Sequence, residues 1–144
     1  MSRMCFKKKK LPGIKLLSMF SPDVERELAE FELMYPCLLD AGRPYWYTNA
    51  EGWADIFNYI YCEFPMPKYV ASRCDCEDFA IHLKGLVSAL FGLNYFAIAV
   101  GDAPAGKHAF NLFRDDTGLM IIEPQTANYF ILGEQEYEPE YILL

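Results

Sequence analysis

The chain has 144 residues, a length that fits one domain and is too short for two domains with separate cores. Hydrophobic residues make up 53% of it and charged residues 23%, which excludes a disordered chain and provides enough apolar material for a buried core. The formal net charge of −7 argues against nucleic acid as a ligand, because phosphate binding requires a basic surface.

Positive charge is concentrated at the N-terminus. Residues 1–15 carry a local charge of +6 and no acid, which leaves −13 for the remainder. We predict a flexible basic arm over residues 1–20 and a single domain over residues 21–144. The arm is interpreted as a solvated terminus, with contact to a membrane surface or an acidic partner as the alternative.

The cysteines do not show the spacing of a small secreted disulfide scaffold. The N-terminus has no signal-peptide pattern, because Pro12 and Lys15 interrupt the apolar stretch and no small-residue cleavage site follows. No run of 18 apolar residues occurs, so we expect no membrane span. A reduced, cytoplasmic protein is the prediction. The five cysteines are Cys5, Cys37, Cys62, Cys74 and Cys76.

Two helices are predicted in the first half of the chain. Ser21-Pro22-Asp23 is typical of a helix start, with serine as the cap, and Pro36 is expected to end that helix. Residues 36–47 are predicted to form an irregular, aromatic-rich loop. Thr48 and Glu51 match a capping box, and the helix that follows places four apolar residues on one face. These residues are Trp53, Ile56, Phe57 and Ile60.

The third helix has the clearest boundaries. Asp75 is predicted to cap it, apolar residues recur at helical spacing from Phe79 to Phe91, and Gly92 ends it. Cys76 is in phase with this apolar stripe. It is therefore expected in the first turn, toward the packed side of the helix.

The remaining chain is rich in β-branched and aromatic residues and is predicted to form strands. Helices followed by a run of strands indicate an α+β fold, in which N-terminal helices, the cysteine helix among them, pack on an antiparallel sheet. The predicted strands are Tyr95–Val100, His108–Phe113, Leu119–Ile122, Tyr129–Leu132 and Tyr141–Leu144.

The turn at 115–118 determines which side chains meet across two of these strands. If the hairpin has a two- or four-residue loop, the numbers of paired residues sum to 233. His108 and Glu123 then lie on one face as diagonal neighbours, within reach of each other. A three- or five-residue loop would turn one of them to the other face.

Cys76 can join this pair if its helix packs on the sheet. Backbone N–H groups at a helix N-terminus stabilise a thiolate, and a histidine oriented by a carboxylate can act as its base. The acids Asp75, Glu77 and Asp78 in the same turn oppose this effect, because negative charge raises the pKa of a thiol.

At these positions the sequence resembles the transglutaminase-like cysteine peptidases, a branch of the papain-like superfamily. The segment Cys74-Asp75-Cys76-Glu77-Asp78-Phe79-Ala80 is similar to the cysteine motif of that family. Gly106-Lys107-His108-Ala109 is similar to its histidine strand, and Ile122-Glu123 to its acidic position. The resemblance covers roughly residues 48–126, with the three elements in the family's order.

The resemblance implies a papain-like, transglutaminase-like fold and a cysteine-dependent hydrolase or acyl transferase acting on a peptide or protein substrate. Cys76 would be the nucleophile, His108 the general base and Glu123 the orienting acid, with an acyl-enzyme intermediate and no cofactor or metal. Two positions depart from the family: glutamate replaces the usual aspartate or asparagine at 123, and no glutamine precedes Cys76 to supply an oxyanion donor. Trp53 or Tyr69 is a candidate for that donor.

Two other functions remain open from the sequence. In the first, the fold is a non-catalytic module that binds a peptide or protein. In the second, Cys74 and Cys76 bind zinc together with His108 or Cys62, as a structural site.

Overall fold

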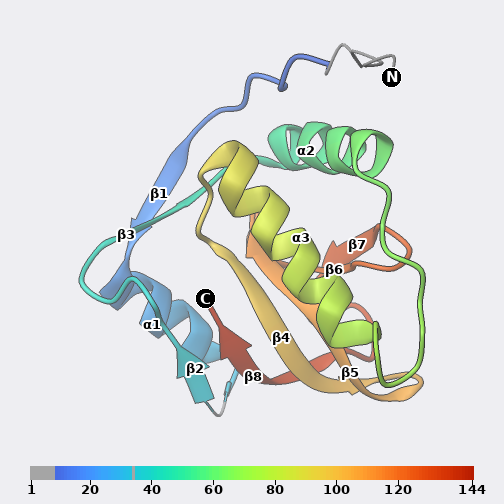
Figure 1. Ribbon diagram of the computed structural model, residues 1–144. Helices are drawn as coiled ribbons and strands as arrows, with labels where there is room; N and C mark the ends of the chain where they lie inside the picture. The colour runs from blue at the N-terminus through green and yellow to red at the C-terminus, as the bar shows by residue number, and fades with distance from the viewer. Residues whose placement is uncertain (1–8, 34) are drawn as a thin grey trace.

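The structure, a computed structural model, describes residues 9–33 and 35–144. In this part of the chain, three helices and three strands come first, and five further strands follow the last helix (Figure 1). The helices are α1 (Ser21–Glu30), α2 (Ala50–Glu63) and α3 (Cys76–Phe91). The strands are β1 (Leu17–Phe20), β2 (Tyr35–Cys37), β3 (Pro44–Tyr47), β4 (Phe96–Ala103), β5 (Gly106–Arg114), β6 (Leu119–Glu123), β7 (Asn128–Ile131) and β8 (Glu138–Leu143).

A six-stranded sheet in the order β2-β8-β4-β5-β6-β7 is the framework of the fold. Its pairs are antiparallel except for β2, which runs parallel to β8. β1 and β3 form a separate antiparallel ribbon. The β5–β6 hairpin pairs Asn111 with Ile122 and Arg114 with Leu119, so the predicted register is confirmed.

Each face of the sheet carries its own apolar core. On one face, α2 and α3 pack through residues such as Trp53 and Leu83 against Phe96 and Phe113 (Figure 1). On the other face, α1 and β3 pack through residues such as Leu28 and Tyr45 against alternate residues of the same strands. Burial on both faces explains why the central strands are almost continuously apolar.

Asn111 joins α3 to the sheet. It is fully buried on β5, and its side-chain amide donates to the carbonyl oxygens of Ala80 in α3 and Ala97 in β4, both at 3.0 Å. A buried amide with these two partners fixes the height of α3 over the sheet, because moving the helix would leave the donors unpaired. This contact positions the N-terminal turn of α3 beside β5.

Several predicted elements are confirmed. The apolar face of α2 is buried as predicted. Asp75 is the N-cap of α3, and Gly92 ends that helix with a φ of 67°, a left-handed conformation that favours glycine. All five predicted C-terminal strands are present, with shifted ends.

The N-terminal third differs from the prediction. The first helix ends at Glu30, and Pro36 lies in the edge strand β2, where a missing N–H is tolerated. Ser21 does not cap α1: its hydroxyl accepts from the Gly42 N–H at 2.7 Å. Asn49, not Thr48, caps α2 by accepting from Gly52 N–H.

These differences correct the predicted fold class. Residues expected to form an arm and a loop instead contribute β1, β2 and β3, so that the fold has eight strands beside its three helices, and the sheet is mixed instead of antiparallel. The physical reason is that a three- or four-residue strand carries too few residues for a recognisable alternation. Residues 1–8 of the predicted basic arm lie outside the described residues.

Candidate functional site

The first turn of α3 presents Cys76. The connector before it closes through a bridge between Val70 and Cys74, and Asp75 caps the helix. The Asp75 backbone N–H donates to the Asp78 carboxylate at 3.2 Å, which fixes the entry into the helix. Cys76 is half-buried at this point.

The Cys76 thiol is surrounded by groups that favour its protonated form. It donates a hydrogen bond to the Glu77 carboxylate, with Sγ and Oε2 3.2 Å apart. Burial raises the pKa of the Cys76 thiol, the nearby Ala109 N–H opposes this, and Glu77 and Asp75 raise it further. Burial and the two neighbouring acids thus favour the thiol over the thiolate.

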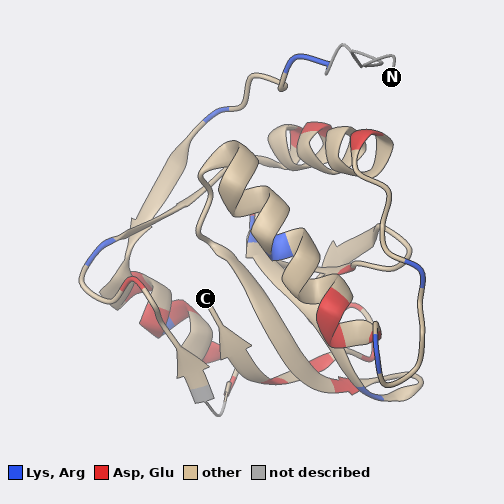
Figure 2. Cartoon of the chain, viewed as in Figure 1, with Lys and Arg blue, Asp and Glu red and all other residues tan. Residues whose placement is uncertain are grey.

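Asp75 and Glu77 make the same turn acidic (Figure 2). Their carboxyl groups share a hydrogen bond, which raises the pKa of Asp75 and lowers that of Glu77. The ligand atoms of Asp75, Cys76 and Glu77 lie within 4.8 Å of one another and form the one cluster of metal-binding groups within residues 9–33 and 35–144. The zinc set considered from the sequence, with Cys74 and either His108 or Cys62, is not assembled there.

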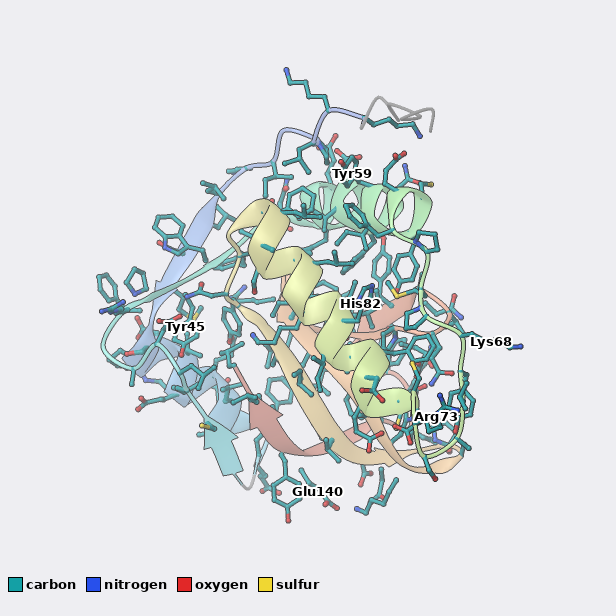
Figure 3. The ribbon with its side chains drawn as sticks, in the orientation of Figure 1. Tyr45, Tyr59, Lys68, Arg73, His82 and Glu140 are labelled. Atoms are coloured by element: carbon teal, nitrogen blue, oxygen red, sulfur yellow. The ribbon has the colours of Figure 1, made fainter. Side chains whose placement is uncertain are left out.

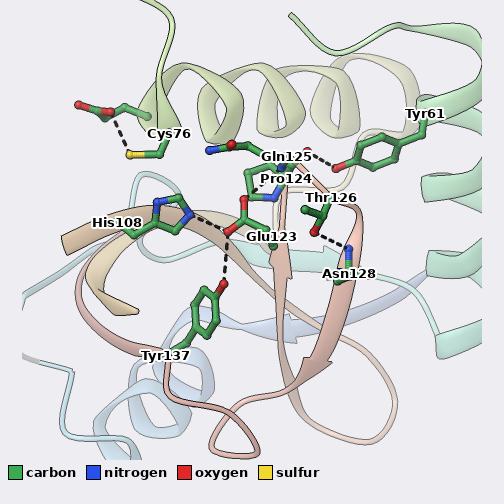
Figure 4. Close-up of polar contacts among 10 residues, drawn as sticks. Tyr61, Cys76, His108, Glu123, Pro124, Gln125, Thr126, Asn128 and Tyr137 are labelled. Carbon is green, nitrogen blue, oxygen red and sulfur yellow. Dashed lines mark hydrogen bonds and ion pairs between the residues drawn. The ribbon is translucent and has the colours of Figure 1, made fainter. Parts of the chain in front are cut away.

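His108 and Glu123 meet on the sheet as the hairpin register predicts. His108 Nε2 and Glu123 Oε2 are 2.6 Å apart, and their side chains are 20% and 12% exposed (Figure 4). The same carboxylate accepts from the Gln125 N–H at 3.1 Å and from the Tyr137 hydroxyl at 3.4 Å. The Glu123 carboxylate thus accepts three hydrogen bonds, and this network holds the His108 ring in one orientation.

The turn after Glu123 is tied down from α2. Tyr61 donates its hydroxyl proton to the Pro124 carbonyl oxygen at 2.7 Å, and burial together with the Glu123 charge raises the Tyr61 pKa. The N–H groups of Thr126 and Ala127 both donate to the Glu123 carbonyl oxygen. These bonds make the β6–β7 turn a fixed wall for the site.

A pocket of about 270 Å³ opens beside this network. One side is the β4–β5 hairpin turn, and the other is formed by the polar residues around Glu123. Cys76 is not among the residues that line it. The lining residues are Ala103, Pro104, Ala105, His108, Glu123, Gln125, Thr126 and Tyr137.

The structure brings the three predicted site residues to one end of the sheet but joins only two of them. His108 contacts Glu123 (Figure 4). The Cys76 thiol instead donates to Glu77 and lies near the backbone N–H of Ala109. Among the described residues, no hydrogen bond links the thiol to the imidazole.

Other parts of the site were not anticipated from the sequence. Tyr137 lies in an acidic, turn-rich segment that carries no motif, and Gln125 contributes through its backbone N–H as well as its side chain. Trp53, considered as an oxyanion donor, is buried in the core and donates its indole N–H to the Arg114 carbonyl oxygen at 2.7 Å.

Comparison with known proteins finds solved structures that have a similar fold. No protein-family model and no curated sequence matches the chain. Solved structures do match: a PSL1a-E64 complex, with 20% sequence identity and a TM-score of 0.72, and Polyporus squamosus lectin bound to the human-type influenza-binding epitope Neu5Acα2-6Galβ1-4GlcNAc, with 18% identity and a TM-score of 0.73. Each match covers 89% of this chain and 51% or 50% of the other chain.

The fold is therefore one that occurs in lectin structures, and the chain spans about half the length of these neighbours. This finding corrects the predicted membership of the transglutaminase-like peptidases and the papain-like α+β fold that came with it. The description as a cysteine peptidase or hydrolase with a catalytic triad is corrected with them. Within the described residues, no helix has the length and apolar character needed to cross a bilayer.

Proposed function

We propose that the chain is a non-catalytic binding module that holds a carbohydrate in the pocket between the β4–β5 turn and Glu123. The observation that carries the proposal is the satisfied His108–Glu123–Tyr137 network, which lines a pocket from which the Cys76 thiol is absent. Groups held in fixed positions by mutual hydrogen bonds are suited to recognise a ligand.

The chemistry of the lining supports a ligand with many hydroxyl groups. Glu123 has acceptor capacity on two oxygens, Gln125 and Thr126 each offer a donor and an acceptor, and the Tyr137 hydroxyl does the same. The three alanine and proline residues of the β4–β5 turn supply a small apolar wall. A sugar ring presents hydroxyl groups at its edge and C–H groups on its faces, which matches this division.

The environment of Cys76 supports a non-catalytic binding function. Nucleophilic attack by cysteine requires a thiolate, and both burial and the neighbouring acids disfavour that form here. The fold adds support from outside the chain, because a neighbour with it is a lectin bound to a glycan. On this support we propose a saccharide ligand in place of the peptide or protein substrate expected from the sequence.

Nuclear magnetic resonance tests the proposal. Galβ1-4GlcNAc is titrated into ¹⁵N-labelled protein, and amide shifts are expected in residues 103–109 and 123–128. Gln125→Ala removes a side chain from the pocket and is expected to weaken binding roughly tenfold, about the effect of one lost polar contact. Gln135→Ala, at an exposed position outside the pocket, is the matched control and should bind as the parent does.

Two results would overturn the proposal. One is the absence of amide shifts in the pocket with Galβ1-4GlcNAc and with a panel of other neutral oligosaccharides. The other is chemistry at the thiol, seen either as peptide cleavage that Cys76→Ala abolishes or as a mass increase on Cys76 after incubation with E64.

A further inference from the structure

The charges around the pocket restrict the ligand further. None of the eight residues that line it is lysine or arginine. His108 is the one lining residue that can carry positive charge, and its Nε2 is already committed to Glu123. An acidic ligand would therefore find no free cation in the pocket.

The nearest basic residue along β5 is also occupied. Lys107 forms ion pairs with Asp102, at 3.1 Å, and with Glu140. On the connector before α3, Arg73 is exposed and outside the lining, and Lys68 extends away from the protein (Figure 3). None of these three cations lines the pocket.

Negative charge approaches the pocket from two elements. The Glu123 side chain is 12% exposed, so its carboxylate is poorly screened by water. On α3, hydrogen bonds from Asp75, from its own backbone and from Cys76 lower the pKa of Glu77, and the nearby His108 lowers it further. A ligand carboxylate entering here would lose hydration beside a buried carboxylate, which is unfavourable without a paired cation.

We infer that the pocket selects uncharged saccharides and excludes those that carry an acidic sugar. This inference rests on the proposed function and deepens it by naming the ligand class. It sets the chain apart from the Polyporus squamosus lectin complex, whose bound epitope contains N-acetylneuraminic acid, an acidic sugar.

Paired titrations test the inference on the full chain. Calorimetry compares Galβ1-4GlcNAc with Neu5Acα2-6Galβ1-4GlcNAc at low and high salt. The neutral disaccharide is expected to bind at least about tenfold more tightly at low salt, and this ratio should shrink at high salt because ions screen the repulsion. Glu77→Gln should weaken the repulsion of the acidic sugar and so reduce the ratio between the two affinities. It should leave the affinity for the neutral disaccharide unchanged, because Glu77 does not line the pocket.

Glu30→Gln, which removes an exposed acid on α1, is the matched control and should leave the ratio as it is in the parent. Equal or tighter binding of the sialylated saccharide would overturn the inference and leave the proposed function standing. A ratio that does not respond to salt would also overturn it. Binding of neither saccharide would overturn the proposed function and the inference together.

Discussion

Two surfaces that meet beside His108 are built on different principles. The sheet wall, formed by β5, β6 and the residues around Glu123, is largely buried, and the Glu123 carboxylate in it is held by hydrogen bonds from His108, Gln125 and Tyr137. The helix wall, formed by the first turn of α3, lies outside the pocket lining, is more exposed and carries adjacent acids that hydrogen-bond among themselves. The sheet wall holds polar side chains in fixed positions, and the helix wall contributes mainly negative charge.

This difference indicates where each kind of change will act. A substitution on the sheet wall disturbs packed strands and satisfied hydrogen bonds, so it should lower stability and binding together. A substitution on the helix wall changes the local potential with little effect on folding, because exposed charges contribute little to stability. The predictions below test this contrast, from the largest expected effect to the smallest.

The largest effect is expected at Gly101, which is paired with His108 across β4 and β5. A Cβ atom there would lie 2.0 Å from the Glu138 carbonyl oxygen and 2.8 Å from the Pro139 Cα, both backbone atoms of β8. Gly101→Ala should therefore destabilise the protein by about 3 kcal/mol, because the strands must separate. Urea denaturation measures the change.

Gly85→Ala is the matched control on the helix side. No atom lies within 4 Å of a Cβ at Gly85, which is in the middle of α3. The substitution should stabilise the protein by roughly 0.5–1 kcal/mol, because alanine is the better helix former. Equal stability of the two variants would contradict the assigned close approach of β4 and β8.

A second contrast compares one acid from each wall. Glu123→Ala removes the acceptor of three hydrogen bonds and should destabilise the protein by about 2 kcal/mol. Glu77→Ala removes an exposed acid and should change stability by no more than roughly 0.5 kcal/mol. Thermal melts of both variants measure the two changes in stability. A larger loss of stability in the Glu77 variant than in the Glu123 variant would contradict this contrast.

A smaller effect is expected at Tyr137. Its hydroxyl lies 3.4 Å from Glu123 Oε2, which is a long hydrogen bond, and the rest of the ring packs edge-on against Phe110. Tyr137→Phe keeps the packing and should cost only about 0.5 kcal/mol. Because burial and the Glu123 charge raise the Tyr137 pKa, the parent's tyrosine absorbance titration should also contain a late-ionising group that this variant lacks.

The sequence predicted the second half of the fold better than the first. From residue 50 onward, helices have clear caps and apolar stripes, and the Asp115–Gly118 turn determines a register that places His108 beside Glu123. Residues 17–47 form three strands of three or four residues, too short for a periodic pattern. Their pairing depends on distant partners, such as β8 for β2.

The motif around Cys76 shows the limit of local patterns at the site. The spacing of Cys76, His108 and Glu123 predicted a nucleophile, a base and an acid. Sequence spacing does not specify which atom the thiol faces, and in the structure Glu77 holds it. Tyr137 and Gln125 join the site through the β6–β7 turn and the approach to β8, which only the assembled sheet defines.

The central claim, that the site holds a ligand and does not attack one, is tested most directly by the protonation of Cys76. Iodoacetamide labelling of the native protein is followed by peptide mapping from pH 6 to pH 10. Because burial and neighbouring acids raise the pKa of this thiol, Cys76 should be labelled slowly at neutral pH and should reach half its maximum at a higher pH than a free cysteine does, and at a lower pH in Glu77→Gln than in the parent. Rapid, selective labelling of Cys76 near pH 6–7 that His108→Ala slows would contradict the claim.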